Sequence, residues 1–236
     1  MNTDTPSPTD IPLDGFDAAA KGFPPTANPF DAEHALSDYE WWDYRHCAFR
    51  CDRAVDEGAL ARSREQPLSA CPYTFEAHGN VYQAWYHGWE EMQKVADVAA
   101  IIRKAIEPGL SVCATSGKPI AAGACLHASV LLAKALNRTG RAGASVRGGS
   151  GADGSSGARD TSGRWHGHYW VEAAVSYPSS CFIDITADQF GWPAVRILTT
   201  ADAGDDYRPG PQDEVDDAVR DLAKEFGIEP REVGLD

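Results

Sequence analysis

With 236 residues and a formal net charge of −14, the chain can build one sizeable core, or one domain with a small accessory module, which argues against two full-sized domains. The acidity lies at the ends: residues 1–40 carry eight acidic side chains against one basic, residues 202–236 carry twelve against four, and the 161 residues between them sum to +1. This distribution argues against the broad basic face that strong nucleic-acid binding needs, although it leaves room for a local patch.

The expected location of the protein follows from the apolar segments and the cysteines. No apolar stretch approaches the roughly 18 residues of a membrane span, and the first residues lack the basic and apolar regions of a signal peptide. Six cysteines are spread over a chain too long to need a disulfide framework. We therefore expect a cytoplasmic protein with reduced cysteines and no membrane partner.

Residues 1–40 are rich in Asp, Pro, Thr and Ala and have few apolar residues at regular spacing. Such a segment cannot bury enough apolar surface to offset the conformational entropy lost on ordering. We expect a Pro-rich, acidic arm that is disordered or loosely draped, with an interaction arm as the alternative.

Residues 41–107 are expected to form a helical module. Ala and Leu recur at short helical spacing over residues 51–64, and Pro67 stops that helix. A second helix, continuing as a core helix over residues 95–107, begins with four apolar side chains that share one face. These four side chains are Val81, Trp85, Trp89 and Met92.

One combination of residues stands out in this module. It consists of Gly58 and Ala61, the turn Cys71-Pro72-Tyr73, and Trp85, Gly88, Trp89 and Glu90. Over about residues 50–94 the chain thereby resembles the ribosome modulation factor family, a small two-helix protein bound to ribosomal RNA, which implies a ribosome or RNA partner. Residues 45–94 hold six Arg or Lys against seven Asp or Glu, however, and a module that binds phosphates is expected to be basic. The alternative is a helical hairpin whose tryptophans pack on the next domain.

Residues 108–208 are expected to form a second domain, which begins with a loop over residues 111–123. Cys125 then opens an apolar run that predicts a helix ending near Asn137. The Gly-rich stretch at residues 148–157 lacks the Gly-Lys-Ser/Thr ending of a phosphate loop. We expect a flexible loop there, and one hypothesis is a mobile flap over the site.

Strand-like segments follow in the second half of this domain. Aromatic and β-branched residues predict strands over residues 168–175 and 181–186, paired as an antiparallel hairpin, and a further strand over residues 195–198. Residues 209–236 are expected to hold a separate acidic helix over residues 213–226. Its apolar positions are Val215, Val219, Leu222 and Phe226.

A cysteine, a histidine and an aspartate occur here in an order that supports acyl transfer. Cys125 lies in the first turn of its predicted helix, where unsatisfied backbone N–H groups and the helix dipole favour the thiolate. His168 is expected to move protons, and it needs an acceptor on its other ring nitrogen to fix its orientation. Asp184 supplies that acceptor if the two strands pair, because cross-strand neighbours approach to about 5 Å.

The fragments around these residues resemble the transglutaminase-like branch of the papain-like cysteine superfamily over about residues 108–200. They are Gly123-Ala-Cys125 at a helix start, Gly167-His168-Tyr-Trp-Val-Glu172 on a strand, and Ile183-Asp184-Ile-Thr186. The resemblance implies an α+β fold in which a helix bearing the cysteine packs on an antiparallel sheet bearing the histidine and the aspartate. It also implies Cys125 as nucleophile, His168 as general acid and base, and Asp184 as the orienting carboxylate, with a protein or peptide substrate. Peptidases, crosslinking acyltransferases and deamidases all belong to this superfamily, so the reaction stays open.

Three further residues are expected to contact substrate: His166, Trp170 and Gln189. His166 is two residues from His168, so on a strand it shares a face with it and competes as the base. His127 is two residues along the helix from Cys125 and points elsewhere. A zinc site built from His46, Cys47, Cys51 and Cys71 lacks a paired Cys-x-x-Cys spacing, so we expect no metal and no cofactor.

Three classes of function remain. The first is a cysteine-dependent enzyme that acts on an amide through a thioester on Cys125. The second is a binding protein that docks on a ribosome or protein partner through residues 50–94, without catalysis. The third is a purely structural role, in which replacing Cys125 or His168 changes stability and no activity.

Overall fold

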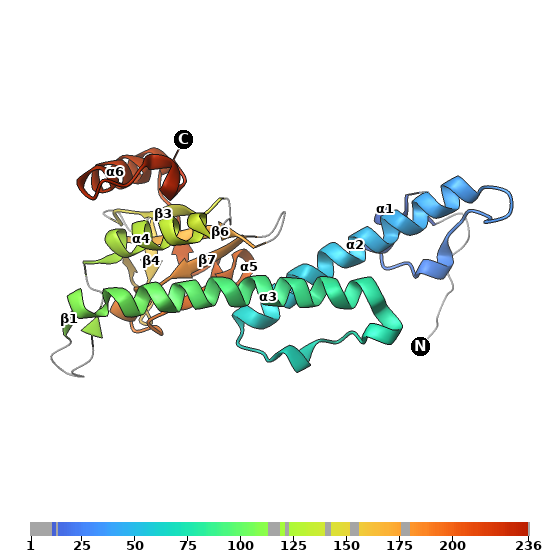
Figure 1. Cartoon of the computed structure of the whole chain (residues 1–236), viewed down its shortest axis with the longest axis horizontal. Helices are drawn as coiled ribbons and strands as arrows, with labels where there is room; N and C mark the ends of the chain where they lie inside the picture. Colours follow the sequence, from blue (N-terminus) through green and yellow to red (C-terminus); the bar gives the residue numbers. More distant parts are fainter. Residues whose placement is uncertain are drawn as a thin grey trace. The chain divides into compact units, whose positions relative to one another are not determined.

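The computed structural model of the chain describes residues 11–12, 14–112, 119–120, 123–139, 143–151, 156–175 and 180–235, and these form two compact units. Within them, the residues up to Ala61 and those from Pro67 to Trp89 form unit 1. Arg62–Gln66 and the residues from Glu90 onward form unit 2. Helices occur in both units and the described strands lie in unit 2, so the chain is α+β, as predicted (Figure 1).

The helices are α1 (Gly15–Ala20), α2 (Leu36–Ser63), α3 (Phe75–Ile106), α4 (Cys125–Arg138), α5 (Thr200–Ala203) and α6 (Gln212–Glu225). The strands are β1 (Ser111–Val112), β2 (Pro119–Ile120), β3 (Ser145–Gly149), β4 (Gly157–Arg159), β5 (Trp165–His166), β6 (His168–Ala174), β7 (Ser180–Asp184), β8 (Arg196–Thr199) and β9 (Tyr207–Arg208). Short 3-10 turns are η2 (Pro25–Ala27), η3 (Leu68–Ala70), η4 (Glu107–Gly109), η5 (Ala187–Phe190) and η6 (Pro230–Val233). None of the described helices combines the length and the hydropathy that crossing a membrane requires.

The N-terminal segment is more ordered than its composition predicts. Asp14 caps α1 by accepting hydrogen bonds from the backbone N–H groups of Phe16 and Asp17. Ala18 is fully buried, and the Trp42 indole donates to the carbonyl of Pro12. Where composition predicts a disordered or loosely draped arm, the segment thus holds a capped helix and a buried contact. Residues 1–10 and 13 lie outside the described residues.

Helix α2 begins at Leu36, well before the start predicted near Cys51. The residues before Cys51 show no regular apolar period. Two of the buried side chains there, a tryptophan and a histidine, have rings that also carry a polar N–H group. Trp42 and His46 are both buried and stack at 5.1 Å, and His46 donates through Nε2 to the carbonyl of Phe23. Contacts with the preceding segment thus stabilise a stretch of helix that the sequence pattern does not reveal.

The helix pair of unit 1 crosses at two glycines. A Cβ placed on Gly58 of α2 would overlap the carbonyl of Trp85, and one on Gly88 of α3 would overlap the carbonyl of Val55. Only glycine permits backbones to approach this closely. Beside the crossing lies a core cluster of Ala54, Ala61, Val81 and Trp85. Gly58, Ala61, Trp85 and Gly88, which prompted the comparison with ribosome modulation factor, therefore pack inward within unit 1.

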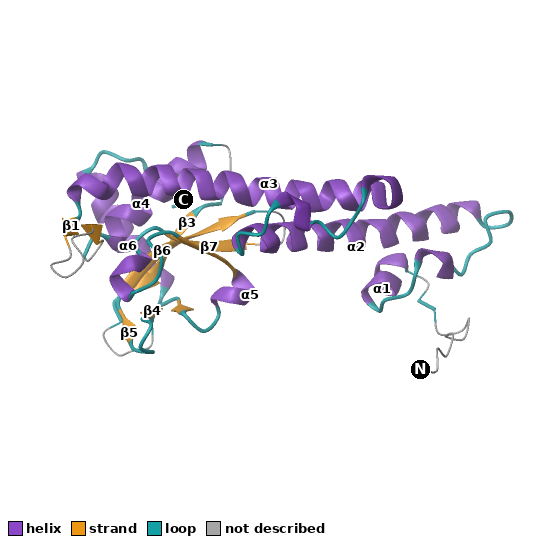
Figure 2. Cartoon of the chain, turned by 90° about the horizontal axis from the view of Figure 1, so that it is seen from below, coloured by secondary structure: helices purple, strands orange, loops and turns teal. Residues whose placement is uncertain are grey.

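Unit 2 is built on a four-stranded antiparallel sheet with the order β3-β6-β7-β8. Figure 2 labels three of its strands, β3, β6 and β7. A smaller sheet has the order β5-β4-β9, and β1 pairs with β2. Helix α4 packs on β6, and α6 packs on β3 and contacts α4. The predicted hairpin of residues 168–175 and 181–186 is confirmed by the antiparallel pairing of β6 with β7.

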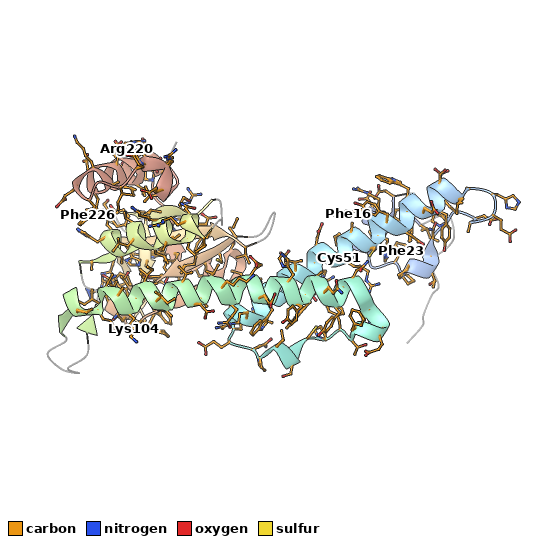
Figure 3. All side chains as sticks on the ribbon, in the orientation of Figure 1. Phe16, Phe23, Cys51, Lys104, Arg220 and Phe226 are labelled. Carbon is orange, nitrogen blue, oxygen red and sulfur yellow. The ribbon has the colours of Figure 1, made fainter. Side chains whose placement is uncertain are left out.

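Three other predictions need correction. The second half of α3 and residues 62–66 belong to unit 2, so the helical module does not extend over residues 41–107. Helix α6 also belongs to unit 2, and its side chains at Val215, Val219 and Leu222 are buried. Phe226 lies just past the end of α6 and is 55% exposed, so it is not part of that apolar face (Figure 3).

The Gly-rich stretch is a loop only in part. Gly148 and Gly149 belong to β3, and Gly157 belongs to β4, whereas residues 152–155 lie outside the described residues. Gly157 has φ 108°, and a Cβ there would overlap the carbonyl of His166. Glycine is therefore required at this point by close packing against the backbone of the histidine-bearing segment, and not by flexibility.

Candidate active site

Cys125 is the first residue of α4. The preceding residue, Ala124, is the N-cap, and its side chain makes no capping hydrogen bond. The first backbone N–H groups of an α-helix have no partner inside the helix, so they surround the position of the thiol with hydrogen-bond donors. The Cys125 side chain is partly exposed, whereas Cys181 is buried. Cys125 therefore combines a helix N-terminus with access to solvent.

His168 and Asp184 are brought together by the register of β6 and β7. Val171 pairs with Ile183, and one further step along the same ladder sets Asp184 opposite Trp170. His168 is two residues before Trp170, so it is the diagonal neighbour of Asp184 on the same face. The His168 Nε2 atom lies 2.7 Å from the Asp184 Oδ2 atom.

Asp184 is buried and its two carboxylate oxygens accept four hydrogen bonds. Thr186 donates to Oδ1 through its backbone N–H at 2.8 Å and its hydroxyl at 2.9 Å. His168 and the Tyr207 hydroxyl, at 3.0 Å, both contact Oδ2. Burial raises the pKa of this carboxyl, but the charge of His168 and these hydrogen bonds outweigh burial, so the pKa is lowered. The ionised carboxylate accepts hydrogen bonds only, so the proton between the two side chains is carried by His168 Nε2.

The His168 ring is fully buried, and Cys125 is one of the groups that act on its charge. Burial lowers the pKa of the ring, but the Asp184 carboxylate and a side-chain hydrogen bond with Cys125 outweigh burial and raise the pKa to about 9. Because Nε2 faces Asp184, Nδ1 is the ring nitrogen that remains for the thiol. His168 thus has a direct hydrogen bond to Asp184 and an electrostatic interaction with Cys125.

Gln189 lies against the same ring nitrogen. Its Nε2 atom is 2.9 Å from the carbonyl oxygen of Thr186 and 3.3 Å from His168 Nδ1. Arg103 of α3 holds this turn in place, since it donates to the carbonyl of Ile185 and makes a two-pronged ion pair with Asp188. Gln189 therefore lies against the histidine, and its contact with substrate stays a prediction.

The other two predicted contact residues have different surroundings. Trp170 is 0% exposed within a core cluster, where no substrate can touch it, so its predicted role is wrong. His166 is partly exposed and belongs to β5, and the chain passes at Gly167 from the smaller sheet to β6, so the two histidines do not share one strand. His166 Nε2 lies 2.7 Å from Asp160 Oδ2 instead. The sequence pattern predicted both histidines on one strand because it did not reveal the change of sheet between them.

Several residues that build the site were not predicted. Tyr207 comes from β9 and reaches Asp184 from more than twenty positions away in the chain, and Arg103 comes from a helix predicted only as core. Neither contact has a local sequence signal, because both depend on how the sheets and α3 pack. The contact of Thr186 with Asp184 did have a local sequence signal, since Thr186 follows Asp184 at the spacing of an Asp-x-Thr fragment.

Comparison with known protein families, with characterised proteins and with solved structures finds no match to this chain. Within the described ranges, no group of three or more His, Cys, Asp and Glu side chains could hold a metal ion. What the site can do must therefore be argued from its geometry.

Proposed function

We propose that the protein is a cysteine-dependent acyl-transfer enzyme that acts on an amide, with Cys125 as nucleophile, His168 as general acid and base, and Asp184 as the orienting carboxylate. The observation that carries this proposal is the buried His168–Asp184 hydrogen bond of 2.7 Å, in a ring that also interacts with the thiol at the start of α4. A helix with the cysteine at its first residue, packed on an antiparallel sheet with the histidine and aspartate, is also the arrangement expected of a papain-like core.

The reaction follows from the two ring nitrogens. His168 Nδ1 takes the thiol proton of Cys125, and the thiolate forms a C–S bond to the amide carbonyl carbon. The C–N bond then breaks, and the amine leaves with the proton from Nδ1. Asp184 stays ionised and holds Nε2–H, which stabilises the imidazolium and fixes the ring.

The resulting thioester on Cys125 is resolved in a second half-reaction. Water or an amine gives a proton to Nδ1 and attacks the carbonyl carbon, the C–S bond breaks, and the thiolate recovers the proton. Hydrolysis, deamidation and crosslinking differ only in which amine leaves and which nucleophile enters. The backbone N–H groups at the start of α4 are the donors closest in sequence to the negative charge that develops on the carbonyl oxygen.

A thiol-labelling experiment tests the proposal. Iodoacetamide at pH 7, followed by peptide mapping, is expected to modify Cys125 at least about tenfold faster than the other five cysteines, because a stabilised thiolate reacts and a thiol does not. The variant His168→Gln should lose this advantage, and Cys71→Ser is a matched control that should keep it. Equal labelling of all six cysteines would contradict the proposal.

A second measurement examines acyl transfer itself. The activated ester p-nitrophenyl acetate should leave an acetyl group on the Cys125 peptide, seen by mass spectrometry, with release of one p-nitrophenol per modified thiol. The variant Cys125→Ser with the same ester should show no such peptide. Acetylation that persists in that variant would assign the nucleophile to another residue.

A further inference from the structure

Gln189 makes two contacts through one amide nitrogen, and each defines what that atom does. The Thr186 carbonyl oxygen can only accept, so the Gln189 atom 2.9 Å from it must be the amide nitrogen, which donates. The same nitrogen lies 3.3 Å from His168 Nδ1. An amide nitrogen has no lone pair to offer, so this second contact is favourable only when Nδ1 carries no proton.

The groups around His168 therefore have opposite effects on the protonation of its ring. Asp184 holds a proton on Nε2 and favours the imidazolium through its negative charge. The thiol of Cys125 needs the lone pair of Nδ1 in order to give up its proton. Gln189 N–H is directed at that same lone pair, and it meets an N–H in place of an acceptor once the proton has moved.

Resting on the proposed function, we infer that Gln189 is a positioning residue that competes with Cys125 for Nδ1 of His168 and so limits transfer of the thiol proton to the ring. The turn that carries Gln189 is held by the ion pair between Arg103 and Asp188, whose shortest distance is 2.7 Å. The Arg103 side chain is 6% exposed and the Asp188 side chain is 15% exposed. A rigid turn keeps the amide at the ring, so the competition is built into the fold.

The groups that face this ring come from every element packed around it. Three of them are Cys125 of α4, Asp184 of β7 and Tyr207 of β9. The pairs His166–Asp160 and Arg103–Asp188 lie beyond Phe190 and Gln189. Tyr169 and Glu214 lie on the Cys125 side. Of the two described hydrogen bonds to the ring nitrogens, the Gln189 amide favours an unprotonated Nδ1 and the Asp184 carboxylate favours a proton on Nε2. Removing the amide should therefore shift the balance in a single direction.

The test compares the full chain with the variant Gln189→Met, which keeps the length of the side chain and loses the donor. The rate of iodoacetamide reaction at Cys125 is measured from pH 5 to pH 10. Around pH 9, where the wild-type ring loses its proton, the variant ring should stay charged and Cys125 should react faster than in the wild type, by up to about the tenfold that a single neutral hydrogen bond supports. Gln83→Met, at an exposed position of α3, is the matched control and should leave the profile unchanged.

A titration of the His168 ring by NMR separates this inference from the proposed function. In Gln189→Met the ring should hold its proton to higher pH than in the wild type, whether or not Cys125 proves reactive. A ring that titrates at the same or lower pH, or a thiol that reacts no faster, would overturn the inference. If Gln189→Met does not fold, Gln189→Asn, whose shorter side chain cannot span both contacts, is expected to show the same two shifts. Slow labelling of Cys125 in the wild type, with the ring shift present, would instead contradict the acyl-transfer proposal alone.

Discussion

Unit 2 contains two His–Asp pairs with equal separation and different surroundings. The Nε2 to Oδ2 distance is 2.7 Å in both His168–Asp184 and His166–Asp160, and both rings contact Phe190. The side chains of the first pair are 0% and 2% exposed, and those of the second are 35% and 18% exposed. Water screens an exposed pair and makes it a weak contributor, whereas a buried pair becomes costly to break. Distance alone therefore does not say which pair can do chemistry.

The largest expected effect comes from breaking the buried pair. Asp184→Asn keeps the shape of the side chain and removes its charge, which leaves His168 buried without a counterion. We expect a loss of about 3–5 kcal/mol in the free energy of unfolding, measured with urea. Asp160→Asn is the matched variant of the exposed pair and should lose far less. Equal losses would show that burial does not distinguish the two pairs.

The next effect is a dependence of stability on pH. The pKa of His168 is raised to about 9, above the ordinary value near 6.5, so its contribution is fully present below about pH 6.5 and is lost as the pH rises to 9. The loss should be on the order of 3 kcal/mol over that window. His168→Gln should flatten this limb and His166→Gln should retain it, as followed by urea unfolding at a series of pH values. An unchanged limb in His168→Gln would place its origin elsewhere.

A smaller effect is expected at the hydroxyl that supports Asp184. Tyr207→Phe removes one donor from the buried carboxylate while the Thr186 and His168 contacts remain. We expect a loss of about 1–2 kcal/mol. The acid limb of stability should also begin at higher pH, because the lowered pKa of Asp184 moves back up and the stabilisation it provides is lost as the pH falls. Tyr169→Phe, at a partly exposed neighbouring position, should produce neither change.

The smallest effect is expected at the exposed pair. His166→Gln should leave both the unfolding free energy and the labelling rate of Cys125 close to those of the wild type. If His166→Gln slowed labelling as much as His168→Gln, the two pairs would act as one unit, and the role of base would have to be shared between them.

The sequence predicted local features of the fold and did not predict the contacts between residues that are distant in the chain. The helix that begins at Cys125 and the pairing of β6 with β7 follow from apolar periodicity and turn residues, which are local signals. The burial of Trp170 and the change of sheet at Gly167 depend on neighbours that are distant in the chain. Periodicity contains no information on such neighbours.

The same contrast holds in unit 1. Val81 and Trp85 share a buried face, as their spacing predicts. The start of α2 at Leu36 was not predictable, because its stability depends on contacts with the segment that carries Phe23. Acidic, Pro-rich composition indicated disorder for residues that form α1, where the cap at Asp14 and the burial of Gly15 and Ala18 favour order.

The glycines beside the histidine segment have a further consequence, for alternative strand pairings. Gly157 and Gly167 are positions where any Cβ would overlap neighbouring backbone, at His166 and Ser150 respectively. A slip of one residue between these segments would replace a glycine with a side-chain-bearing residue, such as Ser156 or Ala158, at the point of closest approach. Steric exclusion of the shifted registers thus helps to fix the backbone that leads into the imidazole.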